Sequence, residues 1–407
     1  MSAIATVTRH ADRAARWSAI ALGFSIPISV ALDGVLSVVV LAGWLASGNY
    51  RQKLDAIARN PVAIGALLLY AMLLIGSLYG QRDPGDASDY LGKYADLLLI
   101  PIFVFCFRDA TDRRRAIYAF TASLVLTLAL SFIVRTGWLP DVSFIKGDAA
   151  NPSVFKKSVT HSILMSFGAF LFLNIALRGS VAYWRWIWGG LAVLAGVNVL
   201  LMVQGRTGYV ILGALTLYSG YRWKGWRGLG ATLIVASVIG GILAVTPNPA
   251  RDRVMLMIKE AKDWQPGKPI NSTTYRLAFY RNSVAIMSRH PVFGVGTGGF
   301  PKAYAEQARG TRLESSRNPH DEYLLIGIQI GLIGLALLLH LFWQHWRLAP
   351  RLATPFETHL SRGLLLTIAV GCLFNSLLLD HTEGLLFAWM TGLLYGGLES
   401  RETGNRK

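Results

Sequence analysis

The chain has 407 residues, of which 53% are hydrophobic and only 15% are charged. Soluble domains are about 25% charged, so the composition argues against a disordered chain, a coiled coil and an ordinary soluble enzyme, and it favours a membrane protein. The formal net charge of +17 would suggest a nucleic-acid partner in a soluble protein, but basic residues gather in the cytoplasmic loops of membrane proteins, so no nucleic-acid partner is expected.

About twelve apolar stretches follow one another along the chain, and several approach the roughly 20 residues that a membrane-spanning helix needs. Asp33 and Gly34 separate the first two. The stretches lie at about 17–31, 33–47, 61–79, 94–107, 116–134, 160–177, 181–203, 207–220, 229–246, 321–343, 363–380 and 384–398. We therefore predict an all-α polytopic membrane bundle of about 12 transmembrane helices. Cys106 and Cys372 fall inside apolar stretches and are expected to be packing residues.

The distribution of Lys and Arg predicts the orientation of this bundle. Three arginines precede the first apolar stretch, and alternate short loops are also basic, whereas the loops 80–92 and 380–383 are poorer in cations. Basic loops tend to stay in the cytoplasm. We therefore expect both termini to be cytoplasmic and the segment 247–320 to lie outside.

The segment 247–320 is by far the longest connection, and it divides the chain into three parts. Residues 1–246 are expected to hold nine transmembrane helices, 247–320 to form a large outer loop with amphipathic helices, and 321–407 to hold three transmembrane helices and a cytoplasmic tail. The outer loop carries many more cations than anions. This excess indicates a solvated surface, a surface on anionic head groups or a site for an anionic ligand.

Within the outer loop, residues 251–263 and 273–290 have the pattern of amphipathic helices. At about 100° per residue, Arg276 lies in the middle of the apolar face of the second helix, whereas Arg281 lies at its boundary. A guanidinium on a buried face needs a counter-charge. Arg276 is therefore expected to have either a carboxylate partner or a phosphate ligand, for which the planar fork of arginine is well suited.

The run HPVFGVGTGGF at 290–300 contains four glycines. It does not fit a dinucleotide-binding fingerprint, because no strand precedes it. A tight turn that packs against other helices is favoured, and backbone N–H groups directed at an anion are the alternative.

His320 stands just before an apolar helix, and Asp321 is expected in the first turn of that helix. A single histidine is often structural. Beside a cluster of arginines at the mouth of a helix bundle, however, it is well placed to act as a general base, because nearby positive charge lowers its pKa and keeps it neutral.

Several further polar residues are expected at outer helix ends. Arg206 follows one apolar stretch, Lys93 precedes another, and Asp380 and His381 form part of a small polar cluster. Each could be an interfacial side chain or could line the same cavity as His320. No metal-binding pattern is present in the sequence, so neither a metal nor a cofactor is expected.

Three of these stretches resemble motifs of the O-antigen ligase family, which also includes O-antigen polymerases and transferases that glycosylate proteins. They are GRTGYV with Arg206, Arg276–Tyr280 followed by the run that ends at Phe300, and the run Pro319–Leu324. Asp321 departs from the pattern, because asparagine is common there.

The resemblance implies an inner-membrane glycosyltransferase of the GT-C type. It would transfer a glycan from undecaprenyl diphosphate to lipid A–core on the periplasmic side, with membrane lipids around it. Positive charge would stabilise the leaving diphosphate, with Arg206 and Arg276 as catalytic candidates and Arg281, Lys93, Asp321, Asp380 and His381 as substrate-binding candidates. His320 would be the general base, and direct displacement would invert the anomeric carbon.

Two alternatives remain open. An O-antigen polymerase would use the same donor with a lipid-linked glycan as acceptor. A flippase or other transporter would be expected to show internal repeats or polar residues deep in its spans, and neither is clear in the sequence. A protein-glycosylating relative is disfavoured, because such proteins commonly carry a further C-terminal domain.

Overall fold

The computed structural model describes residues 3–80, 83–138, 142–179, 181–247, 249–262, 272–310 and 316–398. Within these ranges the protein is all-α, as the sequence predicts, and no strand is formed. The helices are α1 (Ala3–Ser25), α2 (Val30–Ala46), α3 (Tyr50–Ala58), α4 (Pro61–Gly76), α5 (Pro84–Lys93), η1 (Tyr94–Leu98), α6 (Leu99–Cys106), α7 (Ala110–Arg135), α8 (Ser158–Arg178), α9 (Ala182–Val197), η2 (Asn198–Met202), α10 (Arg206–Val245), α11 (Pro249–Lys262), α12 (Ser272–Arg289), α13 (Phe300–Gln307), α14 (Glu322–Leu348), η3 (Ala349–Arg351), α15 (Pro355–Gly371) and α16 (His381–Tyr395).

Several helices are suited to a membrane. Among the described residues, five are long and apolar enough to cross one, or six if α2 and α3, which are bent by 115°, count as one span. The five are Ala110–Arg135, Ser158–Arg178, Ala182–Met202, Arg206–Ile242 and Glu322–Arg351. Each predicted apolar stretch overlaps a helix. The total of about 12 crossings stays a prediction, as do the periplasmic side of the 247–320 segment and the cytoplasmic location of the tail, most of which lies outside the described residues.

The boundary between the first two helices differs from the prediction. Residues 26–29 are non-helical and separate α1 from α2. Asp33 lies inside α2, where it is fully buried. Its Oδ1 accepts a hydrogen bond of 2.6 Å from the Ser25 hydroxyl. Asp33 was predicted to separate the first two apolar stretches, but a carboxylate with hydrogen-bond partners can be buried inside a helix.

A second difference concerns the apolar stretch 363–380. Helix α15 ends at Gly371, and residues 372–380 form a non-helical connection to α16. We call residues 372–380 the α15–α16 connection. The helix ends there because backbone groups of the connection bind other elements, beginning with the Cys372 carbonyl, which accepts a bond of 2.9 Å from the Glu322 N–H.

Helix α10 combines two of the predicted apolar stretches. Its backbone is non-helical at Lys224 and Gly225, and Gly225 has a φ of 58°. Glycine adopts this left-handed conformation without steric cost. Most of the α10 surface is exposed, in contrast to α8, which is largely buried. Helix α8 therefore lies inside the bundle, whereas α10 presents apolar side chains outward.

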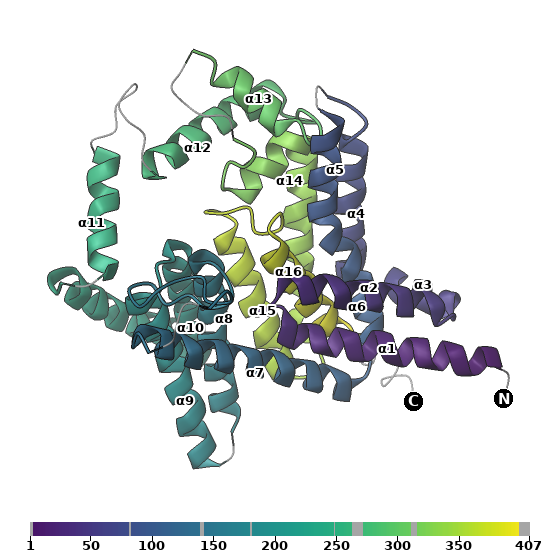
Figure 1. Cartoon of the computed structure of the whole chain (residues 1–407), viewed down its shortest axis with the longest axis horizontal. Coiled ribbons are helices and arrows are strands. Elements are labelled where there is room, and N and C mark those ends of the chain that lie inside the picture. The colour runs from purple at the N-terminus through teal and green to yellow at the C-terminus, as the bar shows by residue number, and fades with distance from the viewer. Residues whose placement is uncertain are drawn as a thin grey trace.

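Helices of the 247–320 segment cover one end of the bundle. Helix α11 confirms the first predicted amphipathic helix and α12 the second. Figure 1 shows α12 and α13 together at the top, next to the N-terminal end of α14. Phe279 and Ile286 of α12 are buried, so the apolar face of α12 packs onto the bundle.

The glycine-rich run 290–300 connects α12 to α13 and forms backbone hydrogen bonds with α14. Helix α14 is broken at Ile330 and Gly331, and the Leu332 N–H donates to the Pro291 carbonyl at 2.8 Å. A Cβ at Gly331 would meet that stretch of backbone, 2.0 Å from the Val292 carbonyl oxygen. The predicted tight turn at 290–300 thus packs against a break in α14.

Candidate active site

The chain leading into α14 is held in a defined conformation. His320 has a φ of 57°, a left-handed conformation that is uncommon for a residue other than glycine. The Asn318 Oδ1 accepts a bond of 2.8 Å from the His320 N–H and one of 2.7 Å from the Ser376 hydroxyl. The α15–α16 connection therefore fixes the backbone that carries the imidazole.

The side chain of His320 is half-buried beneath α12. The ring of Phe279 lies 5.9 Å away between centroids, and the Tyr280 hydroxyl donates to the His320 carbonyl at 3.4 Å. Burial lowers the pKa of His320, and the positive charge of Arg276 lowers it further. The imidazole is therefore neutral at pH 7 and able to accept a proton.

Arg276 lies on the same helix and is also half-buried. Burial lowers the pKa of Arg276; Tyr280 opposes the shift, and the nearby charge of Arg206 adds to it. Among the residues that the structure describes, no carboxylate forms an ion pair with Arg276. Of the two partners that the sequence leaves open for Arg276, the structure thus gives no support to a carboxylate.

Arg206 is the first residue of α10 and is half-buried. The next residue, Thr207, is buried, and its hydroxyl accepts a bond of 2.7 Å from the Asn375 amide. The α15–α16 connection therefore contacts both the start of α10 and the chain before α14. It brings Arg206 and His320 to the same end of the bundle, where α12 adds Arg276. We call these three residues the arginine–histidine cluster.

The α15–α16 connection is itself anchored by a buried carboxylate. Glu322 accepts a bond of 2.6 Å from the Tyr94 hydroxyl and one of 3.0 Å from the Leu378 N–H. Asn318, Asn375 and Ser376 were not among the predicted site residues. The adjacent Asn375 and Ser376 inside an apolar run were the signal that could have revealed the connection, because buried polar side chains require partners.

Two of the predicted substrate-binding residues lie on the elements that carry the cluster. Asp321 is the N-cap of α14, and its Oδ1 accepts a bond of 2.8 Å from the Leu324 N–H. One carboxylate oxygen of Asp321 is therefore used to cap the helix. Arg281 is exposed on α12, the helix that also carries Arg276.

The other three predicted residues form a second group near the start of α16. Lys93 is exposed and pairs with Asp89 at 2.9 Å. The Nε2 of His381 lies 3.9 Å from the Asp33 carboxylate. Burial raises the pKa of Asp380, and the nearby positive charge of Lys93 opposes this shift. Asp380 closes the α15–α16 connection, so this group lies at the same end of the bundle as the arginine–histidine cluster.

The second group also contains a lysine that is not among the predicted site residues. Lys156 is buried, and its Nζ lies 3.7 Å from Asp33 and 3.1 Å from the Thr382 hydroxyl. Burial lowers the pKa of Lys156, although Asp33 opposes the shift. The second group is thus partly neutralised internally.

The glycine-rich run supports packing and not anion binding. The N–H groups of Val295 and Gly296 donate to carbonyls of α14, and that of Thr297 donates to the Gly76 carbonyl, at 2.7–2.9 Å. The Gly298 N–H donates to the Gln329 side chain at 2.9 Å. Because these donors are used within the fold, they are not directed at a ligand.

This geometry defines a chemical capability. Two guanidinium groups and a neutral imidazole lie together in a half-buried site, where electrostatic interactions are stronger than in water. Such a site can stabilise a developing phosphate charge and accept a proton. Within the described residues, no cluster of three or more His, Cys, Asp or Glu side chains is arranged to hold a metal ion.

The apolar helices and this site define a multi-pass membrane protein with a polar centre at one end of its bundle. Residues 191–339 match the family model described as O-antigen ligase. The match confirms the resemblance carried by the motifs, and the matched region contains Arg206, Arg276 and His320. It indicates a membrane glycosyltransferase-like function.

The fold also resembles a solved structure. That structure is described as "Structural coordination of polymerization and crosslinking by a peptidoglycan synthase complex", and one of its chains is 15% identical to this protein, with 84% of this chain and 97% of that chain covered and a TM-score of 0.49. No curated protein matches the sequence.

Proposed function

We propose that this protein is an O-antigen ligase that transfers a glycan from undecaprenyl diphosphate to a sugar hydroxyl of lipid A–core. The observation that carries this proposal is the half-buried arginine–histidine cluster, in which Arg276 has a second arginine and a histidine as neighbours and, among the described residues, no carboxylate in an ion pair. An anionic ligand supplies the counter-charge that such a site requires.

The two arginines are assigned to the diphosphate. As the glycosidic carbon–oxygen bond breaks, negative charge accumulates on the leaving diphosphate, and preorganised guanidinium groups stabilise it. Arg276 is held by α12 and Arg206 by the start of α10, so two independent elements position the charges. Because these charges are part of the protein, we expect the reaction to proceed without a metal ion.

His320 is assigned to the acceptor. A sugar hydroxyl has a high pKa, and a positioned base accelerates its attack by about 10²–10⁴-fold. The hydroxyl oxygen forms a bond to the anomeric carbon, its proton moves to the imidazole, and the lipid diphosphate leaves with the electron pair of the broken bond. Direct displacement predicts inversion at the anomeric carbon. Lys93, Asp380 and His381 are proposed to bind substrate beside this centre, whereas Asp321 supports it as the cap of α14.

The proposed location is the periplasmic side of a bacterial inner membrane. The positive-inside pattern of the short loops supports this assignment. Nucleotide sugars are not supplied in the periplasm, so a donor there must arrive already activated, and a lipid diphosphate meets that need.

The test is transfer by purified full-length protein in EDTA, with lipid-linked donor and lipid A–core. The wild-type protein is expected to form glycosylated lipid A–core. The rate of transfer by His320→Ala is expected to be about 10²–10⁴-fold lower. His290→Ala is the matched control, because His290 is exposed at the end of α12, and it should keep full activity. Robust turnover by His320→Ala would remove the base assignment, and inhibition by EDTA would remove metal independence.

The acceptor separates the two transferase hypotheses. An O-antigen polymerase would leave lipid A–core unmodified and would lengthen the glycan on the lipid-linked donor. A flippase or transporter would produce neither product. Formation of glycosylated lipid A–core without lengthening of the donor therefore supports the ligase.

A further inference from the structure

A cavity lies at the opposite end of the bundle from the arginine–histidine cluster. Its volume is about 580 Å³, and its walls come from the first turns of α7 and α15 and the last turn of α8. His320 lies beside the other ends of these elements, since the α15–α16 connection follows the C-terminus of α15. Helix α15 has 17 residues, so the two sites are separated by about 25 Å along its axis.

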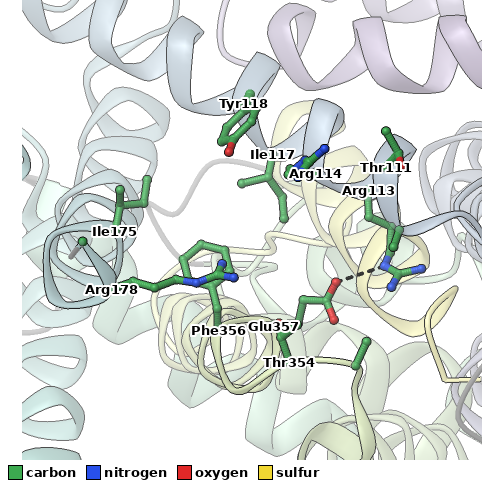
Figure 2. Close-up of a pocket in the computed structure, with 13 residues that line it drawn as sticks. Thr111, Arg113, Arg114, Ile117, Tyr118, Ile175, Arg178, Thr354, Phe356 and Glu357 are labelled. Atoms are coloured by element: carbon green, nitrogen blue, oxygen red, sulfur yellow. Dashed lines mark hydrogen bonds and ion pairs between the residues drawn. The ribbon is translucent and has the colours of Figure 1, made fainter. Parts of the chain in front are cut away.

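One ion pair in the cavity wall is complete within the protein. The Nε of Arg113 lies 3.0 Å from Glu357, and both side chains are buried, with 2% and 9% exposure. The same guanidinium donates to the carbonyls of Phe107 and Arg108. Figure 2 shows this pair at one side of the cavity. Arg113 therefore has a structural task and adds no uncompensated charge.

Two further arginines give the cavity its net charge. Arg114 and Arg178 are exposed, and among the described residues neither forms an ion pair with a carboxylate. The guanidinium of Arg178 lies 5.0 Å from the ring centroid of Phe356, which orients it against one wall. Since Arg113 and Glu357 balance each other, the cavity carries a net charge of about +2 from these two side chains.

The remaining wall is apolar and lies at the level of helix ends. Ile117, Ile175 and Phe356 line it, and the exposed Tyr118 stands at its edge (Figure 2). A site with cations at helix ends and apolar side chains beside them matches an amphipathic ligand, because phosphate groups of lipids lie at that depth and acyl chains continue along the helices. Basic pockets between transmembrane helices bind anionic head groups in this way.

We propose that this cavity binds the head group of an anionic phospholipid, with Arg114 and Arg178 on its phosphate and the apolar wall against its glycerol and first methylene groups. Arginine can bind two phosphate oxygens at once, and two arginines from different helices can hold one phosphate between α7 and α8. On the predicted orientation the lipid belongs to the cytoplasmic leaflet. This site is independent of the proposed transferase reaction.

The test is lipid binding by the purified full-length protein, measured with fluorescent phosphatidylglycerol. Unlabelled phosphatidylglycerol is expected to displace the probe at least about tenfold more effectively than phosphatidylcholine. The double variant Arg114→Gln/Arg178→Gln is expected to bind about 25-fold more weakly, or about fivefold for each charge. The matched control is Arg51→Gln/Arg59→Gln, which removes two exposed arginines of the same predicted side at α3, and its affinity should not change.

Several outcomes overturn the proposal. Equal displacement by phosphatidylcholine would exclude recognition of net charge, and this arm uses only the wild-type protein. Displacement by inorganic phosphate at the same concentration as by phosphatidylglycerol would assign the cavity to a small anion instead of a lipid. Equal weakening by the α3 control would mean that the charges act through a diffuse surface potential and not through this cavity.

Discussion

Arg113 and Arg276 are both held inside the protein, but their surroundings differ. Arg113 has 2% exposure and a carboxylate at 3.0 Å, and it also binds two backbone carbonyls. Arg276 is half-buried, its charged neighbours include Arg206, and no carboxylate among the described residues pairs with it. Within the described residues, the fold satisfies the first guanidinium with a carboxylate, and the proposed function assigns the second to a ligand.

This comparison separates two uses of one residue type. Breaking a buried ion pair leaves an uncompensated charge and destabilises the fold. Removing a guanidinium that stands near another positive charge, and that has no carboxylate ion pair among the described residues, should mainly affect ligand binding and turnover. Mutations at the two positions are therefore expected to affect different properties of the protein.

The largest effect on stability is expected at Glu357. The substitution Glu357→Ala leaves Arg113 buried without its partner and should lower the free energy of unfolding by about 3–5 kcal/mol. Chemical unfolding of the purified protein measures this loss. Asp55→Ala is the control, because Asp55 is exposed, and it should change the value by about 0.5 kcal/mol or less. Equal losses for the two variants would contradict the structural role of the Arg113–Glu357 pair.

The substitution Arg276→Ala should have the opposite pattern. Turnover is expected to fall by about 10²–10³-fold, as it does when a donor to a developing anion is removed, while the unfolding midpoint stays unchanged. Arg289→Ala tests the same helix at an exposed position and should remain within about twofold of wild type. A destabilised Arg276→Ala protein with normal turnover per folded molecule would mean that Arg276 has a structural role like that of Arg113.

The pH dependence of transfer tests the neighbourhood of His320. Because burial and Arg276 lower the pKa of His320 below its usual value of 6.5, the neutral base is present above the lowered pKa and is lost as the pH falls through it. The half-maximal rate of transfer on the acid side should therefore lie below pH 6.5, with a decline of about tenfold per unit at lower pH. A half-maximal rate at or above pH 6.5 would show that this pKa is not lowered.

A smaller effect is expected in the α15–α16 connection. Asn375→Ala removes the amide that donates to the buried Thr207 hydroxyl at 2.7 Å, which should cost about 1 kcal/mol of stability. Because the same contact positions the start of α10, turnover should fall by up to about fivefold. Unfolding and transfer assays on one preparation measure both effects, and no change in either would mean that the contact does not hold Arg206 in place.

The sequence predicted the helical class and the elements that carry the candidate site residues, because these depend on local patterns. Apolar stretches and helical periodicity located the amphipathic helix with Arg276, and charge beside an apolar helix drew attention to His320. Both lie where the pattern placed them.

What the sequence could not provide are contacts between distant segments. Asp33 was predicted to interrupt a helix, but Ser25 and Lys156 surround it within the fold. The α15–α16 connection was predicted to be part of an apolar span, because its bonds to Asn318 and Thr207 depend on residues far away in the chain. Polar groups buried by tertiary structure cannot be distinguished from breaks until their partners are known.

The most direct test of the account is equilibrium binding of undecaprenyl diphosphate to the purified protein in EDTA. The wild-type protein and Arg289→Ala are expected to bind the lipid equally, and Arg276→Ala is expected to bind it at least about tenfold more weakly, because a charge-assisted contact to phosphate is lost. Equal affinity of all three proteins would contradict the claim that Arg276 is satisfied by a diphosphate ligand.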